Sequence, residues 1–228
     1  MTETQTVAEA AKASSLPALI EASAGQFARV LPAHLGADRY ARWGLSVVRK
    51  ALTGGTEQAE KTRQAWLKVM DSEPGRLSVI AALMDCASLG LEPGREYHLV
   101  PFGGVVTGIT DYKGEIRLIS NANPGWPVVA QLVRSKDTLH MVGANTPPVH
   151  DADWFGDRGV VVGGYAYQQQ GNGLCSLVIR MSETEFAQHR DKARAKTVWE
   201  EWPEAMRLKT LVHQLRKWVP WSAELRQQ

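Results

Sequence analysis

Cysteine is scarce in this chain of 228 residues, and long apolar runs are missing. The two cysteines, Cys86 and Cys175, are too few for a disulfide framework or a cysteine-based metal cluster, so each is interpreted as a small buried hydrophobic residue. No stretch approaches the ~18 apolar residues that span a bilayer. Met1–Glu9 also lacks the basic and apolar regions of a secretory signal. We therefore expect a cytoplasmic protein with no membrane partner.

The motifs of common catalytic and cofactor sites are also missing. No G-x-x-x-x-G-K-[ST] phosphate loop, G-x-S-x-G, H-E-x-x-H or C-x-x-C occurs. Asp151, Asp153 and Asp157 around a glycine resemble a calcium loop. That pattern fails because Phe155 and Val162 stand where carboxylates are required. The sequence predicts a protein that is not an enzyme, with no catalytic residue, metal or cofactor.

Positive charge is confined to one part of the chain. The formal net charge is only +2, and acidic and basic residues balance over 1–96 and over 97–180. The surplus lies in residues 181–228, and the segment Ala205–Pro220 contains four basic residues and no acidic one. A local basic segment of this kind favours a polyanionic partner over an ordinary solvated face.

Hydrophobic periodicity predicts an α+β fold with N-terminal helices, central antiparallel hairpins or a sheet, and C-terminal helices. Residues 1–15, rich in Thr, Ala and Ser, predict a disordered tail, and residues 16–228 a single domain. Gly103–Gly104 between two β-branched runs predicts a hairpin. Ser182 and Glu185 form a capping box, Asp38 is a candidate N-cap, and Gly54–Gly55 is expected to stop that helix. The expected helices cover 27–31, 38–52, 56–70, 77–90, 111–119, 182–191 and 203–218, and the expected strands cover 97–102, 105–110, 128–134, 139–142, 160–167 and 174–181.

The last expected helix carries two different faces. Leu208, Leu211, Val212, Leu215 and Val219 share an apolar face, and the adjacent face carries Lys209, His213, Arg216 and Lys217. A second basic run precedes it, with Arg190, Lys192, Arg194 and Lys196 at alternate positions that suit a loop or an extended segment along a phosphate chain. Trp199 and Trp202 follow directly. Cations beside aromatic rings are what single-stranded nucleic acid needs, although core or subunit packing also explains the tryptophans.

Four segments in order also resemble the RecT family of phage single-strand annealing proteins. They are Leu31-Pro-Ala-His34 with Arg39 and Trp43; Ala87-Ser-Leu-Gly-Leu-Glu-Pro-Gly94 followed by Tyr97–Pro101 and Tyr112-Lys-Gly114; Ser182–Arg194; and Met206-Arg-Leu-Lys-Thr210 through Leu215-Arg-Lys-Trp-Val-Pro220. Together they span most of the chain. The chain departs from the family pattern at His213–Gln214, where an Arg pair is usual, and at Thr197–Val198, where Gly-Pro is common.

The resemblance implies ATP-independent annealing of complementary DNA strands by an oligomeric ring or helical filament, acting in homologous recombination in a bacterial host cell. Single-stranded DNA, annealed duplex, a phage exonuclease and a host single-strand binding protein are the implied partners. Lys209, Arg216 and Arg95 match basic groove residues of the family. The residues themselves add Lys113, Arg117, Lys192, Arg194, Lys196 and Lys217 as DNA-binding candidates, and Tyr112, Trp199 and Trp202 as base-stacking or interface candidates.

Three alternatives remain open from the sequence. A sequence-neutral single-strand binder would cover DNA without speeding its pairing. A metal-dependent nuclease would use Asp111, Asp151 or Asp153, whose spacing suits metal ligation poorly. A phage structural protein would use its tryptophans for subunit contacts only and would show no salt-sensitive DNA binding.

Overall fold

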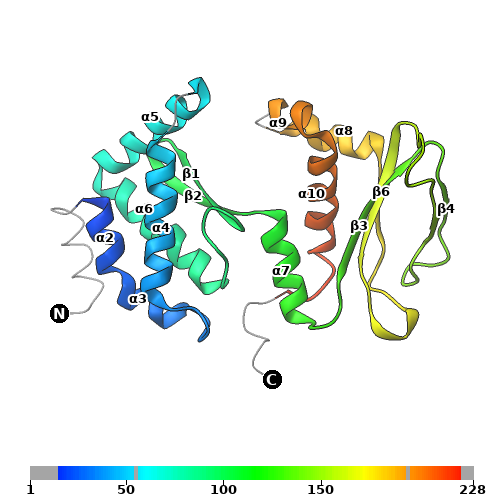
Figure 1. The fold of residues 1–228 in the computed structure, drawn as a ribbon, viewed down its shortest axis with the longest axis horizontal. Coiled ribbons are helices and arrows are strands. Elements are labelled where there is room, and N and C mark those ends of the chain that lie inside the picture. The colour runs from blue at the N-terminus through cyan, green and yellow to red at the C-terminus, as the bar shows by residue number, and fades with distance from the viewer. Residues whose placement is uncertain (1–14, 54–55, 194–195, 222–228) are drawn as a thin grey trace. The chain divides into compact units, whose positions relative to one another are not determined.

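The computed structural model describes residues 15–53, 56–193 and 196–221. The chain divides into two compact units, Met1–Gly114 and Glu115–Gln228. Figure 1 shows helices first, then a hairpin, a sheet and the closing helices. The α+β fold class is confirmed. The expected tail and the glycine stop at 54–55 lie outside the described residues, except for Ser15.

The first unit is built mainly from helices. They are α2 (Leu16–Ala22), α3 (Ala24–Val30), α4 (Ala37–Leu52), α5 (Glu57–Asp71) and α6 (Glu73–Ser88). Helix α2 was not predicted, and α4 begins one residue before Asp38 with Gly36 at its N-cap position. Asp38 therefore lies in the first turn, where its negative charge still suits the helix dipole. Tyr40 of α4 is buried and donates to the Leu83 carbonyl of α6 at 2.8 Å, which joins these two helices.

A two-stranded hairpin completes this unit. Strand β1 (Tyr97–Phe102) pairs antiparallel with β2 (Val105–Thr110), as the sequence predicts. Gly103 and Gly104 both have positive φ, the conformation that a tight hairpin turn requires. The Ser78 side chain of α6 accepts a 2.7 Å hydrogen bond from the Val106 amide, which fixes the hairpin to the helices.

The second unit contains the sheet. Helix α7 (Tyr112–Ala122) leads into it across the boundary between the units. The antiparallel strands β3 (Val128–Arg134), β6 (Val161–Gln168) and β7 (Ile179–Ser182) form a sheet in the order β3–β6–β7. A separate hairpin consists of β4 (Thr138–His140) and β5 (Val149–Asp151), of which β5 was not predicted.

Helices α8 (Glu183–Lys192), α9 (Lys196–Glu201) and α10 (Pro203–Leu215) close the second unit, and a short 3-10 turn, Gly171–Gly173, lies between β6 and β7. The Ser182–Glu185 capping box is present as predicted. Alternation along β6 separates two apolar clusters: Ala166 packs with α8 and α10, whereas Tyr165 and Tyr167 pack on the opposite side with residues near β4.

No helix in the described part of the chain is long and apolar enough to cross a membrane.

Candidate nucleic-acid interface

Helix α10 is anchored along one side by the core of the second unit. Pro203 occupies its first turn, where a missing amide hydrogen does no harm. Leu211, Leu215 and Val219 are buried with Ile119, Ala166, Met181 and Phe186. Gly164 of β6 permits this packing, because a Cβ there would lie 2.8 Å from both the Leu211 side chain and the Gln131 carbonyl oxygen. The apolar face predicted from the sequence is confirmed.

The adjacent face of α10 and the turn after it present the predicted basic row. Lys209 is half-buried, and Lys217 is exposed and donates to the Gln214 side chain at 2.9 Å. His213 is exposed at the surface. Because the opposite face is fixed in the core, these side chains are held at the surface of a rigid element.

Arg216 has a different environment from the two lysines. Its guanidinium donates to Glu115 at 3.1 Å, and the same carboxylate oxygen lies 2.9 Å from His213 Nδ1. Glu115 is 3% exposed. Burial alone would raise the pKa of Glu115, but hydrogen bonds and positive charge from His213 and Arg216 outweigh it and lower that pKa. Arg216 thus neutralises a buried carboxylate, a partner that the sequence did not reveal.

Arg216 also lies against an aromatic ring. Its guanidinium carbon is 4.1 Å from the Trp221 ring centroid, within the range of a cation–π contact. Arg216 is therefore held on two sides, while Lys209 and Lys217 are the better placed of the three to meet a phosphate. Arg207, at the start of the same basic segment, is engaged by Glu183 of α8.

The second basic run is divided between two helices. Lys192 is the exposed last residue of α8 and Lys196 begins α9, so both lie in helices and the loop or extended segment predicted for them is wrong. Arg194 and the side chain of Lys196 lie outside the described residues. Trp199 is 6% exposed and packs in the interior, where its ring is not available to a base, whereas Trp202 is 64% exposed.

Three candidates lie on or beside α7. Tyr112 is half-buried in its first turn and Lys113 is exposed next to it. Arg117 follows one turn later and is half-buried. The lysine is thus open to solvent at the start of the helix.

The first unit has a basic and aromatic groove of its own around Arg95. A cavity of about 460 Å³ is lined by Trp43, Lys50, Arg95 and His98, together with Glu92 and neighbouring residues. Arg95 Nη1 is 3.6 Å from Glu92, a loose contact that leaves its side chain largely exposed. Arg95 was predicted from the sequence and Lys50 was not, although Trp43 and Lys50 lie seven residues apart on one side of α4.

The three aspartates considered for a nuclease lie in different elements, and Asp151 is the last residue of β5. Asp153 accepts hydrogen bonds from the amides of Phe155 and Gly156 in its own loop. Asp111 lies 3.9 Å from His98 in the first unit. Within residues 15–53, 56–193 and 196–221, no three His, Cys, Asp or Glu side chains are grouped as a metal ion requires.

Comparison with known proteins gives a consistent result. The model of the RecT family matches residues 64–228, which include the hairpin, the sheet and α10. The chain is also similar to Protein RecT of Escherichia coli strain K12. The two are 25% identical over 212 residues, which make up 88% of this chain and 72% of that protein.

Proposed function

Because this chain belongs to the RecT family, we propose that it binds single-stranded DNA and anneals complementary strands in homologous recombination. The observation that carries the proposal is that α10 and the turn after it hold Lys209 and Lys217 at the surface of the acid-free segment Ala205–Pro220, while the other face of the helix is fixed in the core. Charge held in this way binds phosphates without regard to sequence.

The chemistry needed for annealing is electrostatic. Two strands repel each other through their phosphates, and cations along the backbone reduce that repulsion. Lys209 and Lys217 supply such cations from the turns of α10 and the residues after it, and the exposed ring of Trp202 offers a surface for a base. If the bases keep their pairing edges open, complementarity alone decides which strands join.

Other basic groups extend the binding surface on each unit. On the second unit we assign Arg117, Lys192, Arg194 and Lys196 to it, with Arg216 as the residue that fixes the helix end. On the first unit we assign Lys113 and the groove around Arg95, where Lys50 adds a cationic side chain and Trp43 and His98 add rings. Each of these groups is expected to contact the phosphate backbone of the DNA and not the edge of a base.

No step in this scheme requires a nucleotide, a metal or a covalent intermediate. We propose that the protein acts as an oligomeric ring or helical filament of a phage, in the cytoplasm of the bacterial host. A phage exonuclease would supply the single strands, and a host single-strand binding protein would compete for them or hand them over.

A fluorescence annealing assay tests the proposal. Two complementary labelled oligonucleotides are mixed in EDTA with and without the protein, and electron microscopy is applied to the product. We expect pairing faster than the spontaneous rate, no effect of added ATP, and no signal from non-complementary strands. Binding without faster pairing would instead favour a sequence-neutral single-strand binder. Shortening of the strands after magnesium is added would favour a nuclease.

A further inference from the structure

The loop between β5 and β6 exposes two adjacent aromatic rings. Trp154 is 56% exposed and Phe155 is fully exposed. Val149, which begins β5, and Val160, just before β6, are also largely exposed. Exposed apolar side chains gathered around one loop mark an interaction site more often than a lone exposed residue does.

Hydrogen bonds within the loop fix its conformation. The Asp153 carboxylate accepts from the Phe155 amide at 3.2 Å and from the Gly156 amide at 3.0 Å. Asp157 accepts from the Gly159 amide at 2.9 Å. The aromatic pair therefore stands on an ordered turn, which reduces the entropy lost when a partner binds it.

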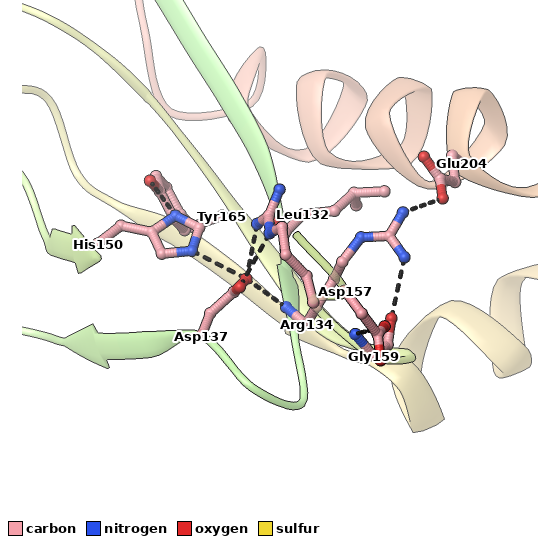
Figure 2. Close-up of polar contacts among 9 residues, drawn as sticks. Leu132, Arg134, Asp137, His150, Asp157, Gly159, Tyr165 and Glu204 are labelled. Carbon is pink, nitrogen blue, oxygen red and sulfur yellow. Dashed lines mark hydrogen bonds and ion pairs between the residues drawn. The ribbon is translucent and has the colours of Figure 1, made fainter. Parts of the chain in front are cut away.

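Figure 2 shows a cluster of polar contacts around Asp137, at the start of the β4–β5 hairpin, that also includes Asp157 and Gly159 of the loop. Asp137 has a side chain that is 1% exposed, and it accepts hydrogen bonds from Arg158 at 2.6 and 2.9 Å and from the Arg134 amide at 2.7 Å. His150 lies 3.1 Å from the same carboxylate and 3.1 Å from the Tyr165 hydroxyl. The hydrogen bonds from Arg158 are the largest cause of the lowered pKa of Asp137, so this carboxylate is ionised at neutral pH.

The cluster reaches the exposed rings through Arg158. The guanidinium carbon of Arg158 lies 4.5 Å from the Trp154 ring centroid, which holds that ring over the buried cluster. Arg134 extends the same support to α10, because its guanidinium contacts Glu204 and the Gly159 carbonyl. A buried network of this extent at the base of a surface loop indicates that the position of the two rings matters.

The charge around the rings argues against DNA as the partner. Asp151, Asp153 and Asp157 are all exposed beside them, and Lys136 pairs with only one of the three. Phosphates would be repelled at this surface. A protein surface with apolar and basic character fits it better.

The first unit of this same chain carries such a surface. A pocket of about 600 Å³ lies between α5 and the tip of the β1–β2 hairpin. It is lined chiefly by Lys61, Ala65, Lys68, Pro101, Phe102 and Gly103. Glu60, also at the pocket, has its carboxylate engaged by Arg63 and Gln64, and Lys61 pairs with Glu57 at 2.8 Å. Lys68 is the exposed cation that the rim offers to an acidic partner. Phe102 is 72% exposed at one wall.

We propose that Trp154 and Phe155 of one copy of this chain bind the pocket at the β1–β2 tip of a second copy. The rings meet Phe102, Pro101 and Ala65, and the aspartates beside the rings meet Lys68. The two surfaces are different parts of one chain, so the contact is head-to-tail and can repeat from copy to copy without closing. The proposal builds on the assembly in the proposed function and gives it a specific contact.

Cross-linking between two single-cysteine proteins tests the contact directly. One protein carries Phe155→Cys and the other carries Ala65→Cys, and the two are mixed with a short bismaleimide. The native thiols of Cys86 and Cys175 are both buried, and burial raises both of their pKa values, so they react slowly. We expect a cross-linked dimer from the mixture and none from either protein alone.

Leu174→Cys in place of Phe155→Cys is the matched control, because Leu174 is also an exposed apolar residue of the second unit. A dimer of equal yield with Leu174→Cys would overturn the proposal. The absence of a dimer from the mixture would also overturn it. A protein that carries both Phe155→Cys and Ala65→Cys and cross-links only within one chain would overturn it as well.

Assembly measurements separate this proposal from the annealing function. We expect Phe155→Ser to raise the protein concentration for half-assembly on long single strands about tenfold or more, the effect of losing an aromatic anchor, with Leu174→Ser unchanged. The affinity of Phe155→Ser for an oligonucleotide so short that only one copy of the protein binds should equal that of the wild type. If wild-type protein fails to anneal but the cross-link forms, the proposed function is wrong and the contact stands. If annealing works and Phe155→Ser assembles normally, the contact is wrong alone.

Discussion

Arg216→Ala is predicted to unfold the second unit more easily, although Arg216 lies in a basic surface row. The substitution leaves the 3%-exposed Glu115 with His213 as its remaining partner among the contacts described. Removing one member of a buried ion pair costs about 3–5 kcal/mol. Arg216 retains some exposure and His213 stays at 2.9 Å, so we expect a smaller loss of about 2 kcal/mol in the free energy of unfolding.

Urea unfolding followed by circular dichroism at pH 7 measures this loss. Lys209→Ala is the matched control, and as a change at the surface it should alter the free energy of unfolding by no more than about 0.5 kcal/mol. The double variant Glu115→Gln with Arg216→Ala should recover most of the loss, because no buried charge remains. Equal stability of Arg216→Ala and Lys209→Ala would refute the reasoning and return Arg216 to the phosphate-binding set.

Three further predictions concern the same unit. Lys209→Ala should reduce the slope of log affinity against log salt for single-stranded DNA by about 0.7, the value for one lost phosphate contact, and a titration from low to high salt measures it. Leu211→Ala should lower the free energy of unfolding by about 2–5 kcal/mol through a core cavity, seen in urea melts, and wild-type stability would contradict the assigned core. The pKa of Asp137 is lowered in the fold, so its contribution to stability is complete above the ordinary carboxyl pKa of about 3.9 and is lost as pH falls through the lowered value. Asp137→Asn should therefore flatten the acid-unfolding curve, and an unchanged curve would count against the cluster.

Local chemistry made several elements predictable from the sequence. The hairpin was predicted to its end residues because Gly103–Gly104 specifies the turn and β-branched runs specify the strands. The Ser182–Glu185 box and the apolar face of α10 were likewise predictable, since each depends on residues a few positions apart.

Contacts between distant residues were not predictable in this way. Glu115 meets Arg216 across about a hundred positions, and no local pattern shows that a cation in a basic row has a buried partner. Trp199 illustrates the same difficulty, because a tryptophan beside lysines has the same pattern whether it packs inside or stacks on a base. The division into two compact units is also a property of long-range contacts. That all the basic candidates form one annealing domain stays a prediction.

The rate of strand pairing tests the central claim most directly. Complementary labelled oligonucleotides are annealed in EDTA without nucleotide by the wild type, by Lys209→Glu and by Arg49→Glu, a matched control at an exposed cation on α4. We predict that the wild type and Arg49→Glu speed pairing alike, and that Lys209→Glu, folded as well as the wild type, is slower by about tenfold because a phosphate contact becomes a repulsion. A wild-type rate equal to the protein-free rate, or a Lys209→Glu rate equal to that of the wild type, would contradict the account.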